Sequence, residues 1–369
     1  MCRPGRSCLL MALGLLMGRE AQGQRTRVDT FDTTYVHDYS RILTGRLFLS
    51  TKYNRLRLGT GTGLKDLEYR PNNRINFGVG ASYRALTLNI GVGVPLLNRD
   101  DAIRGRTHYI DAQANIHTKR WATNLFLQRF AGYFVSSHTL PELGWVQNTT
   151  YPTRPDLREF NVGVSSVHIF NNDRFSYRAS FNQDAWQRKS QGSWLLGGYA
   201  TYFHLGADSS LVPTLLDAQF EDGLHLRRGS FWDVGPMGGY VYTFVLHEHW
   251  FLTGSAVLGI GASLQHAETD PVGSAQLRWS TDVGPGFHVQ LRAGMGYNSS
   301  THYFGLSFNQ ENIGYLIDAR DRFSWAVGNV RLNFVQRFNT RIGFMDRGIR
   351  WFRKRVTEPV QEALPLPKS

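Results

Sequence analysis

The feature that most constrains the fold of this chain is a two-residue alternation through residues 74–95, RINFGVGASYRALTLNIGVGVP. Apolar side chains occupy every second position, and mostly small or polar side chains lie between them. Successive side chains of a β-strand point to opposite faces, so the stretch predicts a β-hairpin with one apolar face. The apolar row includes Ile75, Phe77, Val79, Leu86, Leu88 and Ile90. A water-soluble sheet buries such a face in a core, whereas a transmembrane barrel turns it toward lipid.

The same alternation recurs along most of the chain, which indicates a protein built of β-strands. Further strands are expected at residues 43–59, 107–118, 121–135, 160–170, 175–186, 193–205, 232–246, 250–264, 287–297 and 301–309, with a last one ending at Phe338. Short turns tend to alternate with long connections, as they do in outer-membrane barrels. We therefore expect an all-β, antiparallel transmembrane-type β-barrel of about 12 strands, with roughly 10–14 allowed.

This alternation of short and long connections breaks between Gln187 and Ser230. A short link and a long one follow each other there, without a clear strand to separate them. Asn171-Asn172-Asp173, just before this region, is expected to be a hairpin turn between strands 160–170 and 175–186. One strand is therefore either missed or counted in excess.

The first residues have the pattern of a secretory signal peptide. Arg3 and Arg6 precede an apolar run at residues 8–17, and Ala21-Gln22-Gly23 offers small residues for cleavage before Gln24. Both cysteines, Cys2 and Cys8, lie inside this segment, so the mature chain is expected to be free of cysteine. We expect an exported protein that is not a disulfide scaffold.

The remaining chain is expected to form three regions. Residues 24–42 form a polar N-terminal lead, residues 43–338 the β-barrel, and residues 339–369 a basic C-terminal tail. Beyond the predicted signal, no run approaches the roughly 20 apolar residues that a membrane helix needs. The 13% aromatic residues and 38 glycines suit the girdles and small interior positions of a barrel. The net charge of +12 is no argument for nucleic acid binding in an exported chain.

Several short motifs resemble those of an uncharacterised family of exported Gram-negative β-barrel proteins, known only as a domain of unknown function. The matching segments are Tyr69-Arg70-Pro71-Asn72, the hairpin above, Phe175-Ser176-Tyr177, Gly192-Ser193, Tyr242-Thr243-Phe244, Gly296-Tyr297-Asn298 and the ending from Gly328-Asn329 to Arg337-Phe338. The resemblance extends from about Leu43 to Phe338. It implies an outer-membrane barrel and brings no activity.

Rows of polar residues on the faces opposite the apolar rows are the main candidates for function. A barrel must fill or hydrate its interior, and charges there need partners. The candidate lumen-lining residues are Asp111, Gln113, Asn115, Arg178, Asp184, His288, Arg292, Arg331 and Arg337. They could form a structural hydrogen-bonded interior, a solute path or a ligand site.

Motifs for catalysis or metal binding are weak in this chain. His247-Glu248-His249 places two histidines two residues apart, but it lies on an expected turn and reads more simply as a polar turn. No G-x-S-x-G occurs, and the glycine-rich residues 59–63 have no phosphate-loop lysine. We assign no catalytic, cofactor-binding or metal residues.

The sequence therefore predicts an outer-membrane protein, exported by its signal peptide, that is non-enzymatic and serves small-solute passage, small-solute binding or envelope structure. Its expected partners are outer-membrane lipid, the barrel-assembly machinery and a small solute, with no nucleic acid. Two alternatives stay open. One is an outer-membrane enzyme acting on lipid or lipopolysaccharide, and the other is a secreted soluble β-sandwich or ligand-binding barrel.

Overall fold

The computed structural model describes residues 30–59, 66–72, 75–83, 86–94, 100–136, 144, 150–273, 276–316, 322–338, 340, 343 and 347. The chain divides into two units, and Phe31–Phe338 forms one of them. The other unit consists of Met1–Thr30 and Asn339–Ser369. The predicted signal peptide and, apart from isolated positions, the predicted basic tail lie outside the described residues.

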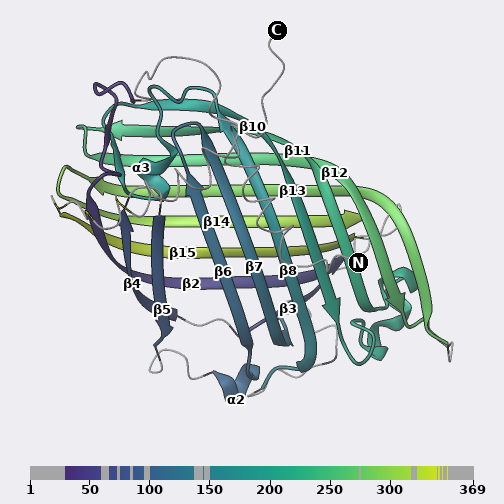
Figure 1. Cartoon of the computed structure of the whole chain (residues 1–369). Helices are drawn as coiled ribbons and strands as arrows, with labels where there is room; N and C mark the ends of the chain where they lie inside the picture. The colour runs from purple at the N-terminus through teal and green to yellow at the C-terminus, as the bar shows by residue number, and fades with distance from the viewer. Residues whose placement is uncertain are drawn as a thin grey trace, which may run out of the picture. The chain divides into compact units, whose positions relative to one another are not determined.

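The unit Phe31–Phe338 is built on one 13-stranded sheet whose neighbouring strands are all antiparallel, which confirms the expected all-β barrel class (Figure 1). In the described part of the chain, ten strands form a closed ring because the last strand pairs with the first long one. The ring consists of β2 (Leu43–Gly59), β3 (Leu67–Arg70), β7 (Trp121–Val135), β8 (Thr153–Ile169), β10 (Gln191–Gly206), β11 (Leu226–Leu246), β12 (Trp250–Thr269), β13 (Arg278–Asn298), β14 (His302–Leu316) and β15 (Arg322–Phe338).

Three further strands of the sheet lie outside this ring: β4 (Ile75–Tyr83), β5 (Leu86–Gly93) and β6 (His108–His117). β2 is long enough to have two neighbours on one edge. Its first half pairs with β4, and its last residues pair with the short β3, which then pairs with the end of β7. β5 continues from β4, and β6 lies on the other side, paired with β7. The four-residue β3 was not expected from the sequence, so the expected strand number is close but not exact.

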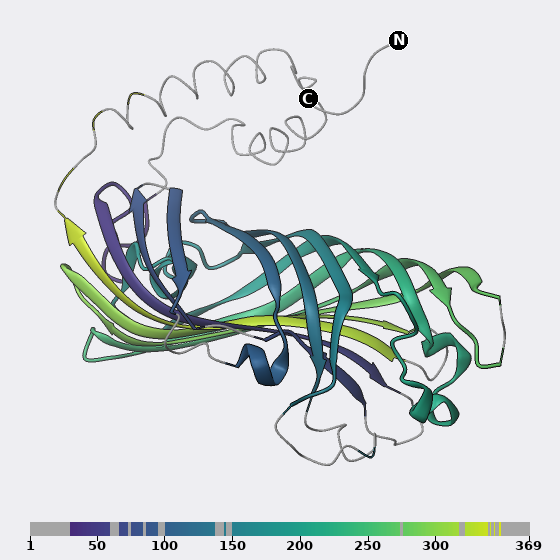
Figure 2. The same cartoon turned by 90° about the horizontal axis from the view of Figure 1, so that it is seen from below.

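The two ends of the barrel differ in their connections (Figures 1 and 2). At one end, here the short-turn end, tight turns join β6 to β7, β11 to β12 and β13 to β14. The turn before β12 has positive φ at both His247 (49°) and Glu248 (62°), as a tight hairpin turn requires. The opposite end, the long-loop end, carries α2 (Asp101–Arg104) and the two 3₁₀ turns η3 (Thr214–Gln219) and η4 (Asp222–Leu224).

A compact piece of chain packs inside the short-turn end, and we call it the plug. It consists of residues 31–41 and 171–190, which contain β1 (Val36–Asp38), α3 (Tyr177–Phe181) and β9 (Ala185–Gln187). β1 and β9 pair with each other in a separate two-stranded sheet. Tyr177 contacts Ser255 on β12, and Arg337 on β15 donates to the carbonyl of Gln183, so the plug lies against the inward faces of the wall.

The prediction of a barrel strand at residues 175–186, after a hairpin turn at 171–173, is wrong. The chain turns inward after β8, forms α3 and β9, and returns to the wall as β10. Phe175 and Tyr177 are buried in an interior apolar cluster. Because they alternate with the polar Ser176 and Arg178, the sequence pattern here resembles that of a strand. β8 therefore pairs directly with β10, and the strand counted in excess accounts for the break in the connection pattern.

A larger apolar core fills the interior toward the long-loop end. Phe203, Phe231, Phe323 and Trp325 are all fully buried, and their rings lie against one another. The loop after β10 adds to this core, which also contains Leu211, Val212, Leu216 and Leu224. The barrel therefore has an apolar filling at one end and the plug at the other.

The outward faces of the wall are apolar and exposed. Val79 is 50% and Ile90 72% exposed, whereas Asn76 and Gly78 on the opposite face of β4 are buried. Similar exposed residues include Leu47, Leu49, Phe77, Val92, Ile110, Leu196, Trp232, Val234, Leu252, Leu258, Ile260, Phe287, Met295, Phe304, Leu306 and Phe334. The predicted orientation of the first hairpin is observed for Ile75, Phe77, Val79 and Ile90, while the side chains of Leu86 and Leu88 lie outside the described residues. Among the described helices, none is long and apolar enough to cross a membrane.

A charge on this outward face should be costly. We expect Val79→Arg to lower the free energy of unfolding from lipid vesicles by about 2–4 kcal/mol, the cost typical of a charge on a barrel's lipid face. Leu215→Arg is the control, because Leu215 is 74% exposed but lies on η3 rather than on the wall. It should change the energy by less than about 0.5 kcal/mol. Equal effects in denaturant titrations would contradict a lipid-facing wall.

Candidate functional site: the barrel interior and its plug

The plug is organised around a buried ion pair. Arg178 donates from Nη2 to Asp184 Oδ2 at 2.7 Å and from Nε to Oδ1 at 3.2 Å, and it lies 3.4 Å from Asp38. Burial acts to lower the pKa of Arg178, but the two carboxylates outweigh burial and raise it. Because Asp38 is the last residue of β1 and Asp184 directly precedes β9, this arginine joins both segments of the plug. The guanidinium is therefore fixed in its charged form inside the protein.

Arginines from the wall hold the plug by its backbone. Arg337 on β15 donates to the carbonyls of Gln183 (2.9 Å) and Ser299, and to the Asn298 side chain (2.8 Å). Arg46 on β2 donates to the carbonyl of Asn182 at 2.7 Å. Since backbone carbonyls leaving a helix lack partners, these cations supply the donors that the end of α3 needs.

The His247-Glu248-His249 turn also fastens the plug. Trp186 of β9 donates its indole N–H to the Glu248 carbonyl at 2.8 Å, and Arg188 pairs with the Glu248 carboxylate at 2.6 Å. The His249 ring stacks on Trp186, with ring centroids 4.9 Å apart. Within the described part of the chain, no three His, Cys, Asp or Glu side chains are placed to hold a metal ion.

A histidine of the plug extends this stack. His37 lies beside Trp186 at 5.7 Å between ring centroids. Burial and the nearby Arg188 lower the pKa of His37.

Polar side chains fill the middle of the barrel between the plug and the apolar core. Lys52 on β2 pairs with Asp111 on β6 at 2.6 Å, and Gln128 on β7 donates to the same carboxylate at 3.1 Å. On the far side, Gln290 donates to Ser165 (2.6 Å) and Glu311 (3.1 Å). These contacts connect strands across the interior. The middle of the barrel is therefore filled by hydrogen-bonded polar side chains, in which opposite charges lie next to each other.

The nine predicted lumen-lining residues lie at different places in this interior. Arg178 and Asp184 belong to the plug, which Arg337 also contacts. Asp111 lies in the polar middle, and buried His288 packs edge-on against Tyr199, with centroids 4.6 Å apart.

The four other members of the set have distinct surroundings. Arg292 lies over the rings of Tyr177 and Phe181, and Arg331 lies over Phe48 at 4.6 Å. Gln113 and Asn115 are the exception to this packing, because both side chains are exposed. A role for the whole set in lining a solute path stays a prediction.

The sequence analysis did not single out Arg46, Lys52, Glu159 and Glu311 as interior charges. All four lie on the inward faces of β2, β8 or β14. For Arg46 the sequence does indicate an inward position, because Arg46 alternates with the apolar Leu47 and Leu49 in an expected strand. Which carboxylate would lie near which cation depends on pairings across the barrel, and spacing along the chain does not give these.

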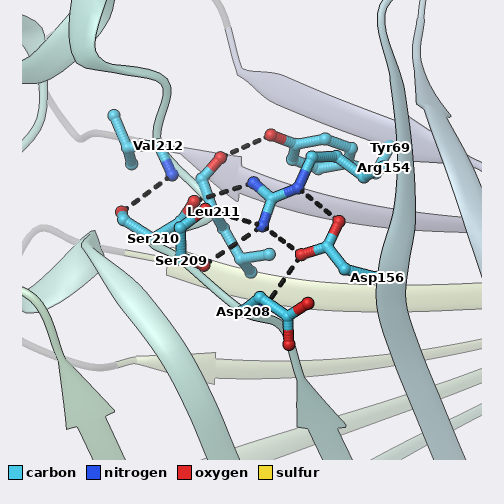
Figure 3. A network of polar contacts seen from close by, with 8 residues as sticks. All are labelled: Tyr69, Arg154, Asp156, Asp208, Ser209, Ser210, Leu211 and Val212. Atoms are coloured by element: carbon cyan, nitrogen blue, oxygen red, sulfur yellow. Dashed lines mark hydrogen bonds and ion pairs between the residues drawn. The ribbon is translucent and has the colours of Figure 1, made fainter.

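At the long-loop end, an open recess of about 400 Å³ lies between the loop after β10 and the ends of β3, β7 and β8. Arg154 is its central cation (Figure 3). It donates to both oxygens of Asp156 at 2.9 and 2.8 Å and to the carbonyls of Ser209 and Ser210. Tyr69 donates to the carbonyl of Leu211. The guanidinium is therefore occupied in holding the loop, which closes the apolar core from this side.

A serine, a histidine and an aspartate meet beside this recess without forming a catalytic relay. Ser210 Oγ and Asp217 Oδ1 both approach the same His225 nitrogen, Nδ1, at 3.5 and 3.8 Å. The other nitrogen, Nε2, is buried and has no hydrogen-bond partner in the described part of the chain. A serine relay needs the hydroxyl and the acid on opposite nitrogens of the imidazole.

Comparison with known proteins gives a family. The family model described as "Domain of unknown function (DUF4421)" matches residues 30–338. No curated protein sequence matches the chain.

Several solved structures are similar to the chain. The outer membrane protease OmpT from Escherichia coli is 9% identical with a TM-score of 0.35, over 82% of this chain and 98% of that one. Ail, the attachment invasion locus protein of Yersinia pestis, is 10% identical with a TM-score of 0.23, over 78% and 98%. The Pseudomonas putida toluene transporter TodX is 9% identical with a TM-score of 0.24, over 80% and 90%. At these TM-scores and identities, the likenesses carry no argument about the fold or the activity of this chain.

Removing the central cation of the plug should loosen the plug alone. Arg178→Ala leaves the Asp184 carboxylate buried without its partner, a change that typically costs about 3–5 kcal/mol. We expect faster hydrogen exchange of amides in residues 177–187, with the closed barrel retained. Arg174→Ala is the control, because Arg174 belongs to the plug but is largely exposed and lies 3.9 Å from Asp32. Unchanged exchange in Arg178→Ala would contradict the ion pair as the centre of the plug.

Removing Arg154 should release the loop over the apolar core. We expect Arg154→Ala to speed cleavage at Asp217 and Glu221 by a protease specific for acidic residues, because the loop carbonyls lose their donor. Arg158→Ala on the same strand is the control, since Arg158 is exposed on the outside. If the two variants are cleaved at the same rate, Arg154 does not hold the loop.

Proposed function

This chain belongs to the family described as Domain of unknown function (DUF4421). We propose that it is an outer-membrane β-barrel that binds a small solute or serves envelope structure, rather than a channel that conducts solutes. The observation that carries this proposal is that its own chain fills the interior at both ends. The plug occupies the short-turn end, and the apolar core with its covering loop occupies the long-loop end. An open aqueous path along the axis would need both to move.

The outward faces support the membrane location. Soluble monomers rarely expose contiguous apolar surfaces of large size. Here exposed apolar residues recur on the outward faces of most strands, while charged side chains gather inside. The same distribution disfavours a secreted soluble β-protein, whose apolar rows would face a core. We further propose that every strand of the sheet except the short β3 crosses the membrane, which leaves twelve of the thirteen strands.

Export and assembly belong to the same proposal. A signal peptide at residues 1–23 would direct the chain through the inner membrane, and barrel-assembly machinery would insert it. An enzyme acting on lipid or lipopolysaccharide is the weaker alternative, because the serine, histidine and aspartate at the long-loop end do not form a relay.

Planar-bilayer recordings test whether the barrel conducts. We expect the reconstituted protein, checked to be folded by its heat-dependent gel mobility, to give no steady conductance. Reconstitution of a known porin under the same conditions is the positive control. Discrete openings with a preference for anions would contradict the proposal, since they would mean that Arg292 and Arg331 line a hydrated channel.

A further inference from the structure

The wall of the barrel has one interval without backbone pairing. β5 pairs with β4 and β6 pairs with β7, but among the described residues no pairing joins β5 to β6. The ring closes around this interval through β3, which bridges β2 and β7 at the long-loop end. Figure 1 shows β5 and β6 as the two edges concerned. A backbone edge at membrane depth is tolerated only where protein or water meets its polar groups.

Exposure of the inward side chains marks this interval as open. Asn89 on β5 and Gln113 and Asn115 on β6 lie on the lumen face, yet all three are exposed. One strand further from the interval, the residues on the same face are buried: Asn124 and Phe126, the register partners of Asn115 and Gln113, are each 6% exposed. The change occurs within one strand spacing, so solvent or lipid reaches the inner face at the β5 and β6 edges.

Two contacts limit the interval toward the long-loop end. The Lys52–Asp111 ion pair joins β2 to β6, and Tyr109 of β6 donates to the Asn76 side chain of β4 at 3.4 Å. Beyond Asp111, the outward residues Ala112 and Ala114 are small, and the facing edge of β5 carries Ile90 and Val92. The outer border of the interval is therefore apolar and lies within the outward apolar surface.

The surface behind the interval is cationic and aromatic. Arg46 donates from Nη1 to Asn89 Oδ1 at 3.2 Å, so its guanidinium reaches the open edge of β5. Phe48 lies against Gly78 and Gly91, where a Cβ at Gly78 would overlap its ring, and Arg331 covers this ring at 4.6 Å.

These two arginines have unused donors. The Nε atoms of Arg46 and Arg331 are buried and have no hydrogen-bond partner among the described residues. The whole Arg46 residue is only 6% exposed. Lys52 and Arg178, in contrast, each have a carboxylate within 3 Å. A cation that lies beside an opening and has no carboxylate in direct contact favours a negatively charged ligand.

We propose that the interval between β5 and β6 is a lateral opening that admits an amphiphile with an anionic headgroup from the bilayer. The headgroup binds Arg46 and Arg331 on the lumen side, and the acyl chain passes over Phe48 and out between Ile90 and Ala112. This inference rests on the proposed membrane location. The ligand class is a single acyl chain with a carboxylate or phosphate, either free or as part of a lipid.

Cysteine pairs test the opening itself. In a Cys2→Ser/Cys8→Ser background, Asn89→Cys with Gln113→Cys places one thiol on each edge. Asn115→Cys with Asn124→Cys is the matched control, because these residues are register partners on β6 and β7. We expect the control pair to form a disulfide on oxidation and the test pair to stay reduced. If the test pair closes as completely as the control, β5 pairs with β6 and the opening does not exist.

Ligand binding tests the chemistry. We expect cis-parinaric acid to bind the detergent-solubilised full chain with an increase in fluorescence, and dodecanoate or dodecyl phosphate to displace it. Dodecanol, which lacks the charge, should not. Arg46→Gln with Arg331→Gln should weaken binding at least tenfold, whereas Arg55→Gln, on the outward side of β2, should leave it unchanged. Gln113→Trp, which fills the opening without removing a cation, should also weaken binding.

Equal displacement by dodecanol, or unchanged affinity in both the double arginine variant and Gln113→Trp, would overturn the proposal. Repeating the measurement in nanodiscs with and without phosphatidylglycerol distinguishes the sources, since competition by this lipid identifies a lipid headgroup as the ligand. Each sample is also tested for heat-dependent gel mobility and membrane insertion. Failure of insertion would refute the proposed membrane location, whereas inserted protein that does not bind would refute only the lateral opening.

Discussion

The structure depends on one constraint, the need of every backbone N–H and C=O in the wall for a partner where no water is available. A sheet satisfies this only by closing on itself, and here the pairing of β15 with β2 over the full length of β2 provides the closure. Closure fixes the register, because a shift by one residue would turn every side chain to the other face. Once β2 has Leu47 and Leu49 outside, Arg46 and Phe48 must lie inside. The position of the charges follows from the pairing of the backbone.

Charges placed inside a narrow barrel must then find partners, and this explains how the interior is filled. An isolated buried ion is costly, whereas an ion pair with additional hydrogen bonds is tolerated. The plug provides such partners: its backbone carbonyls accept hydrogen bonds from Arg46 and Arg337 of the wall, and its own buried Arg178 is paired with Asp184. Toward the long-loop end the interior changes to aromatic side chains, which need few polar partners. The plug and the core are thus two solutions to the same requirement at the two ends.

The sequence predicted the features that follow from a period of two. The outward row of β4 and the inward positions of Asp111, Arg292 and Arg337 could be deduced from alternation alone. Residues 175–186 show where this reasoning fails. Phe175 and Tyr177 alternate like strand residues because the plug is itself packed between opposite walls, with apolar and polar contacts on different sides. Nor does alternation identify Arg46 as a donor to Asn182, since 136 residues separate them and only the closed ring brings them together. The short β3, with four residues, offers too few positions to show a period.

The interval between β5 and β6 is best understood as a local exception to the rule of closure. An unpaired edge in hydrocarbon leaves several backbone groups without partners, each at a cost of several kcal/mol. Side chains that can hydrogen-bond or hold water reduce that cost, and both edges carry amides facing the lumen: Asn89 on β5, and Gln113 and Asn115 on β6. The outward residues that adjoin these amides on β6 include the small Ala112 and Ala114, so lipid chains can approach the edge closely. A strand that needed only to complete the wall would not require polar side chains on its inner face and small ones on its outer face at the same depth. This combination suits an edge that meets lumen water on one side and an acyl chain on the other.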